Sequence, residues 1–181
     1  APHADAWQTI CHVGNGGLCY YDSIELDELR HPLYIHARHF AADSEGAGRF
    51  CGARSAYSEY GPTRGRMDVA YVSDGTVNVA RGARGGLDGS PAGQFKISRN
   101  GDRVDLANCG VVPLEAGERI ASFTTGGGGY GAPVERDPRM VARDVAEGWV
   151  SPERAKTVYR VAVAADGTLD RAATDALRNS G

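Results

Sequence analysis

The residues with the clearest chemical potential are the glycines of Thr124–Pro133, a run that reads TTGGGGYGAP. Glycine has no Cβ, so its backbone can take positive φ and can approach another group closely. The pattern Gly-x-Gly-x-x-Gly is present over residues 126–131, and it binds dinucleotides when its last glycine opens a helix. Here the first good helix start is Asp137-Pro138, six residues later. The sequence therefore favours a shaped loop with a structural or ligand-lining use.

Histidines and cysteines, the usual ligands of transition metals, lack the spacing of a metal site. His36 and His39 are three residues apart in a stretch with strand composition, and side chains alternate between the two faces of a strand. We therefore expect them to point to opposite sides. The four cysteines include no Cys-x-x-Cys pair: Cys11, Cys19, Cys51 and Cys109. Reduced cysteines and no bound metal are the prediction, and a zinc site is the alternative.

Other signatures of catalysis are missing from the sequence. It contains no nucleophile elbow, no paired carboxylates at a familiar spacing and no His-Glu-x-x-His motif. Arg81 and Arg84 could clamp a carboxylate or a phosphate, but arginines in a surface loop are more often solvated or paired. The sequence nominates no catalytic residue.

Composition excludes several classes of function. The chain has 181 residues, a net charge of −3 and 24% charged residues, so no basic surface is available for nucleic acid or an anionic membrane. No apolar run approaches the ~20 residues of a transmembrane helix, and no signal-peptide pattern opens the chain. These features predict a soluble, cytoplasmic protein.

The first two thirds of the chain read as a non-periodic arm followed by short strands. Residues 1–23 carry no clear period and are predicted to form an extended arm or loop that packs on something else. Residues 24–125 are predicted to form a β-rich domain, a sandwich or partly open barrel. Its expected elements are a strand over 33–41, a hairpin of 67–71 with 76–79 around Asp74-Gly75, a hairpin of 95–98 with 103–106 around Asn100-Gly101, and a strand over 119–123.

The last third changes to a helical period. A glycine-rich loop is assigned to 126–134 and a helical segment to 135–181. Three helices are expected: one from Asp137-Pro138 to Gly148, one from Ser151-Pro152, and one capped by Thr168. Residues 160–167 fit either an extension of the second helix or a short extended link. The predicted class is α+β, mostly antiparallel β followed by a C-terminal helical segment.

Two stretches resemble the hydantoinase B/5-oxoprolinase family. Residues 126–159, which read GGGGYGAPVERDPRMVARDVAEGWVSPERAKTVY, are similar to the C-terminal signature of that family. Residues 32–52, with DSEGAGRF at their centre, are similar to a second family block. The family includes the B subunits of ATP-dependent hydantoinases and related large subunits of ketone carboxylases. Together the blocks and their spacing cover most of residues 25–178.

This resemblance implies a small subunit of an ATP-dependent complex that opens a cyclic amide, such as a hydantoin, an oxoproline or a lactam. In the family, the metal ligands lie in a larger N-terminal part and ATP is handled by the A-type subunit. The implied partners are therefore larger A-type and B-type subunits, which would hold ATP and a divalent metal, while this chain binds no cofactor. A subunit of a ketone carboxylase and a purely structural assembly module are the alternatives.

The residue patterns and the resemblance together suggest roles for particular residues. Four residues of the glycine-rich loop are the candidate substrate-binding wall: Gly127, Gly128, Gly129 and Tyr130. Arg49 and Asp137 are assigned structural roles.

The chain departs from the family pattern at several of these positions. Ala132 replaces an acidic residue before Pro133, and Arg160 replaces a glycine that follows the tyrosine of the second predicted helix. Cys51 and Ala53 stand in a stretch that is richer in glycine in the family.

Overall fold

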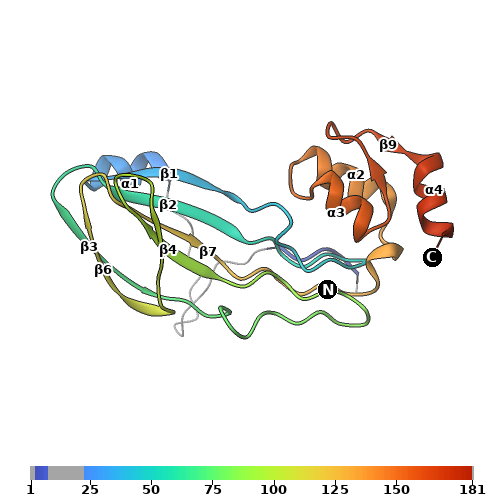
Figure 1. The fold of residues 1–181 in the computed structure, drawn as a ribbon, viewed down its shortest axis with the longest axis horizontal. Coiled ribbons are helices and arrows are strands. Elements are labelled where there is room, and N and C mark those ends of the chain that lie inside the picture. Colours follow the sequence, from blue (N-terminus) through green and yellow to red (C-terminus); the bar gives the residue numbers. More distant parts are fainter. Residues whose placement is uncertain (1–2, 8–22, 181) are drawn as a thin grey trace.

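The structure is a computed structural model that describes residues 3–7 and 23–180. Its shape is elongated, with β-strands at one end, long extended segments in the middle and helices at the other end (Figure 1). The extended segments connect the two ends, so the glycine-rich stretches of the sequence lie at the centre of the molecule.

The largest element is a five-stranded antiparallel sheet in the order β1-β2-β7-β4-β5. Its strands are β1 (Leu33–Phe40), β2 (Ala56–Pro62), β4 (Gly93–Ile97), β5 (Arg103–Asp105) and β7 (Arg119–Phe123). A separate antiparallel pair, β3 (Arg66–Val72) with β6 (Cys109–Glu115), contributes Val69, Val112 and Leu114 to a core cluster with Ile120 of β7. Ala121, the residue after Ile120 in β7, belongs to a second core cluster with Phe95 and Ile97, because adjacent residues of a strand face opposite sides of the sheet.

These sheets confirm the α+β class with mostly antiparallel strands. The predicted strands over 33–41 and 119–123 are present as β1 and β7. The predicted hairpin around Asn100-Gly101 is present as β4 and β5, with Phe95 opposite Asp105 and Ile97 opposite Arg103. The sheets remain open and do not close into a barrel.

The other predicted hairpin is wrong. Residues 67–71 pair with β6, about 40 residues later, and residues 76–79 form no strand. Gly75 does turn the chain with φ of +79°, but Val77 beyond it is 79% exposed and has no core to enter. The buried Val69 of β3 instead packs with Val112 and Leu114 of β6. Tertiary burial therefore overrides the local turn signal.

Two features near the start of the sheet were also not predicted. A short helix, α1 (Ile24–Arg30), precedes β1 and contains no buried residue. In β1 the register shifts between Ile35 and Ala37, which makes His36 the extra residue of a bulge. The bulge interrupts the strict alternation on which the opposite-face argument for His36 and His39 relied, and both side chains are exposed.

The glycine-rich stretch is the central segment of a bundle. We define the glycine bundle as residues 44–53, 80–90 and 124–131, which run side by side (Figure 1). The backbone amides of its central segment donate to carbonyls of both neighbouring segments: Gly126 to Ser90, Gly127 to Ala53, Gly129 to Leu87, Tyr130 to Phe50 and Gly131 to Ala83, with N···O distances of 2.8–3.0 Å.

The bundle requires glycine because backbones touch backbones within it. A Cβ built at any of its central glycines would lie less than 3.0 Å from a backbone atom of another segment or turn: Gly46, Gly48, Gly52, Gly82, Gly86, Gly89, Gly126, Gly127, Gly128 and Gly129. None of these glycines has positive φ. Close approach, rather than an unusual backbone conformation, is the reason for the glycine run.

The helical segment comprises η1 (Pro133–Glu135), α2 (Pro138–Ala146), α3 (Pro152–Thr157), β8 (Ala162–Val163), β9 (Leu169–Asp170) and α4 (Arg171–Asn179). Two predicted starts are confirmed: the side chain of Asp137 accepts from the amide of Arg139, and that of Ser151 accepts from the amide of Arg154. Gly148, with φ of +70°, follows α2 as expected.

The predicted third helix begins too early. Leu169 and Asp170 pair with Val163 and Ala162 as the small β8–β9 ladder, and Asp170 rather than Thr168 caps α4 by accepting from the amide of Ala173. The ambiguous stretch over 160–167 is therefore a short extended link. Across residues 3–7 and 23–180, no helix is long and apolar enough to cross a membrane.

The bundle generates a prediction with a matched control. We expect Gly128→Ala to lower the free energy of unfolding by about 2 kcal/mol or more, because its Cβ would lie 2.1 Å from the carbonyl oxygen of Arg81. Gly93→Ala in β4 should change it by less than about 0.5 kcal/mol, since a Cβ there meets nothing within 4 Å. Urea unfolding measures both variants, and equal stabilities would show that the bundle is loosely packed.

Candidate functional site

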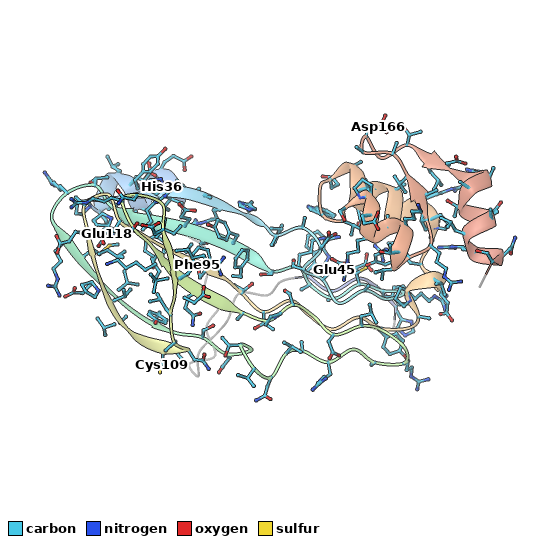
Figure 2. The ribbon with its side chains drawn as sticks, in the orientation of Figure 1. His36, Glu45, Phe95, Cys109, Glu118 and Asp166 are labelled. Atoms are coloured by element: carbon cyan, nitrogen blue, oxygen red, sulfur yellow. The ribbon has the colours of Figure 1, made fainter. Side chains whose placement is uncertain are left out.

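The most unusual chemistry of the described residues lies where the helical segment meets the glycine bundle. Charged side chains are buried there, although charged residues are seldom fully buried unless they are paired. Glu45 of the bundle lies beneath the helices in Figure 2 and is 1% exposed. Arg136 and Asp144 of the helical segment are each 0% exposed. An apolar cluster that includes Val141 and Tyr159 surrounds the contact.

Arg136 is the centre of this contact. One of its terminal nitrogens donates to Oδ1 of Asp5 at 2.7 Å and the other donates to Oδ2 at 2.8 Å, so the pair is bidentate. The second nitrogen also donates to Asp144, at 2.8 Å. The carbonyl oxygen of Arg49 accepts a longer bond of 3.3 Å. Arg136 thus joins an N-terminal residue, the glycine bundle and α2.

Asp144 extends the cluster to a second arginine. Its Oδ1 accepts from Arg54 at 3.1 Å, and the Arg54 guanidinium lies 3.8 Å from the centre of the Trp149 ring. We call Asp5, Arg54, Arg136 and Asp144 the ionic network. Its two arginines and two aspartates balance in charge, which is the condition for burying ions at moderate cost.

A second group of buried polar residues lies beside the ionic network, and we call it the Glu45 cluster. The Tyr159 hydroxyl donates to Oε1 of Glu45 at 2.8 Å and lies 3.2 Å from the sulfur of Cys51. Arg154 of α3 donates to the same Glu45 oxygen at 2.9 Å and to the Glu45 carbonyl at 3.0 Å. The other oxygen, Oε2, is buried without a hydrogen-bond partner among the described residues.

Burial and pairing shift the pKa values of these groups in different directions. Burial raises the pKa of Asp144, and the neighbouring Arg136 and Arg54 oppose that shift only in part. Burial also acts to raise the pKa of Asp5, but its bonds and charge interaction with Arg136 outweigh it and the pKa falls. Burial raises the pKa of the Cys51 thiol to about 11 and the pKa of Tyr159 above its ordinary range.

Local structure explains how these residues reach one another. Arg136 follows η1 directly, in extended conformation, and Asp137 then caps α2. Asp144 is eight residues further on, two turns along α2, and therefore on the same side as the helix start. The sequence places Val141 and Val145 beside it, and these seal the contact from water.

The residues that the sequence nominated for substrate binding lie outside the ionic network and the Glu45 cluster. Gly127, Gly128 and Gly129 lie inside the glycine bundle, with other backbones across their open faces. Tyr130 is half-buried and bridges Phe50 and Ala83. A role for these four residues in substrate binding stays a prediction. Among them, only Tyr130 has a side chain that could contact a substrate.

The nominated arginines lie at the surface. Arg81 pairs with Asp88 at 2.8 Å on an exposed site, as the solvated interpretation expected. Arg84 takes φ of +50° and lies 6.0 Å from the centre of the Tyr130 ring. The side chain of Arg49 is exposed, and its contacts with Gly131 and Arg136 use its backbone.

Sequence reasoning missed the ionic network altogether. Its members are up to 139 positions apart in the chain, from Asp5 to Asp144, so no local spacing connects them. Glu45 and Cys51 stood within a recognised block, but their partners Arg154 and Tyr159 are more than 100 residues away. The sequence offered a signal only for Asp144, which lies between Val141 and Val145 on the apolar side of the predicted helix.

The ionic network joins distant parts of the chain. Both carboxylates of the ionic network bind arginine, and the Cys51 thiol of the neighbouring Glu45 cluster is buried. No group of three or more His, Cys, Asp or Glu side chains within residues 3–7 and 23–180 converges as metal ligands.

Comparison with known proteins places this architecture in a family. The family model described as hydantoinase B/oxoprolinase matches residues 1–133, well over half of the chain. The protein therefore belongs to the hydantoinase B/oxoprolinase family.

Particular relatives define the likeness further. The chain is 32% identical over 178 residues to caprolactamase subunit beta of Pseudomonas jessenii, which covers 96% of this chain and 31% of that relative. The crystal structure of ATP-dependent caprolactamase from the same organism superimposes with a TM-score of 0.72 at 30% identity, over 87% of this chain and 28% of that one. A nucleotide-free acetone carboxylase structure matches with a TM-score of 0.62 at 21% identity, over 88% and 26% of the two chains, which shows a shared fold alone.

The chain thus spans under a third of the length of these relatives.

The structure shows the local setting of two positions at which the chain departs from the family pattern. Arg160, where the pattern has glycine, takes φ of +54°, a conformation that glycine adopts without strain. Ala132 precedes η1 and offers no side chain to cap it, which an acidic residue could do.

The buried thiol gives a testable consequence. Because the pKa of Cys51 is raised from 9.0 to about 11, its contribution to stability is complete below pH 9 and is lost as the pH rises through 11. In a chain whose other three cysteines are serine, we expect Cys51 to react with a thiol reagent at pH 8 at least about 100-fold more slowly than an unperturbed thiol.

The matched control retains only Cys109, which is exposed. Cys109 should react at the rate of a model thiol, with or without urea. Cys51 should reach that rate only above the unfolding transition. Equal rates for the two cysteines in the native chain would show that the contact between bundle and helices opens readily.

Proposed function

We propose that this protein works within an ATP-dependent enzyme complex that opens a cyclic amide, such as a hydantoin, an oxoproline or a lactam. The observation that carries the proposal is the likeness to caprolactamase subunit beta, which extends over 96% of the chain in sequence and 87% in structure. Opening a lactam requires activation of an amide carbonyl, and coupling to ATP supplies the driving force for that activation.

In this proposal the chain contributes structure and is not catalytic alone. Three features support that role: the ionic network is internally paired, Cys51 is buried with a raised pKa, and the glycines of the bundle contact other backbones. ATP and a divalent metal would be held by larger A-type and B-type partner subunits. Tyr130 would be the residue of this chain that reaches the pocket wall.

Reconstitution tests the proposal. The chain would be co-expressed with larger A-type and B-type subunits and assayed for ATP-dependent opening of caprolactam, hydantoin and 5-oxoproline. We expect the three subunits to co-elute, the complex to turn over at least one of these amides, and the chain alone to turn over none. Turnover by the chain alone, or full activity of the complex without it, would contradict the proposal.

The same complex distinguishes the two alternatives. A ketone carboxylase subunit would give bicarbonate-dependent consumption of acetone or acetophenone and no amide opening. A purely structural module would leave KM unchanged in Tyr130→Phe. The matched control is Tyr34→Phe in β1, which is 51% exposed and remote from the bundle. A rise in KM confined to Tyr130→Phe would place its hydroxyl on the substrate.

A further inference from the structure

The described N-terminal residues, His3–Trp7, lie against the glycine bundle, and we call them the strap. Three of its five residues are exposed, and only Asp5 and Ala6 are half-buried. The Ala6 amide donates to the carbonyl of Cys51 at 2.9 Å. Trp7 projects outward and is 82% exposed. Asp5 is therefore the residue of the strap whose side chain makes the polar contacts with the rest of the described structure.

Both carboxylate oxygens of Asp5 accept hydrogen bonds. Its Oδ1 accepts from Arg136 at 2.7 Å and from the Cys51 amide at 2.8 Å, while its Oδ2 accepts from Arg136 at 2.8 Å. A planar guanidinium fork with an added backbone N–H matches the lone pairs of a carboxylate closely. Both donors belong to the folded body of the protein, and the carboxylate alone comes from the strap.

The charges around the site require a carboxylate there. Arg136 is fully buried, and Asp144 also binds Arg54. Without Asp5, one aspartate would face two guanidinium groups, and a buried charge that has lost its partner is strongly destabilising. A neutral strap could reach the same place and would leave this imbalance unchanged.

We propose that Arg136 and the Cys51 amide form a carboxylate-binding site, which the strap occupies with Asp5 and thereby latches the glycine bundle to the helical segment. The site recognises an aliphatic carboxylate as such. When the Asp5 side chain is removed, it takes a free monocarboxylate the size of acetate, which is the group that an aspartate presents beyond its Cα.

Chemical rescue tests the site in the full chain of residues 1–181. Asp5→Gly removes the methylene and carboxylate and leaves the rest of the strap in place. We expect its melting temperature to be lower than that of the wild type in chloride, and to rise saturably as acetate replaces chloride at constant ionic strength. The wild type should show no such rise, because its site is filled.

Two further variants sharpen the result. Asp5→Asn fills the space with a neutral group, so it should be destabilised and not rescued by acetate. The matched control is Asp88→Gly: Asp88 also accepts from an arginine and a backbone amide, those of Arg81 and Gly82, but at an exposed place. Its stability should respond equally to acetate and chloride, because water replaces the lost carboxylate.

Each outcome decides the proposal. If Asp5→Gly melts like the wild type, or if acetate stabilises all four proteins alike, the proposal is wrong. If Asp5→Gly does not fold in chloride, its refolding yield is compared between acetate and chloride instead. A higher yield in acetate, seen for Asp5→Gly and not for Asp5→Asn, supports the site, and equal yields overturn it.

Discussion

The structure depends on one buried cation. Arg136 is fully enclosed, and it stays charged because carboxylates from two distant parts of the chain surround it. Burial by itself would lower the pKa of Arg136, but the bonds and charges of its partners, Asp5 foremost, outweigh burial and raise it. Removing one partner from a buried ion pair typically costs about 3–5 kcal/mol, so this group, together with the apolar cluster and the Glu45 cluster, holds the helices on the bundle.

The glycine bundle provides the surface on which that contact forms. Its segments pack backbone to backbone, which keeps the side chains that remain, such as Glu45 and Cys51, aligned toward the helices. A bundle of larger residues would separate the segments and move these groups apart. The glycines therefore form a close-packed support for the helical segment.

The combination of rigid bundle and ionic contact fits a piece of a larger assembly. The two relatives compared above are more than three times as long as this chain, and the buried charges of the ionic network are paired with one another. Under the proposed function, this fixed shape is what the chain would contribute to the complex.

The sequence by itself determined the elements that short-range physics controls. Asp137 and Ser151 cap helices as their spacing predicted, and the turn at Asn100-Gly101 joins two paired strands. Only the tertiary structure decided the partner of β3, the backbone packing of Gly128 and the meeting of Asp5 with Arg136. Caps and turns are made by residues that are neighbours in the chain. Burial brings together residues that are far apart in the sequence, and a single sequence does not show which of them will be in contact.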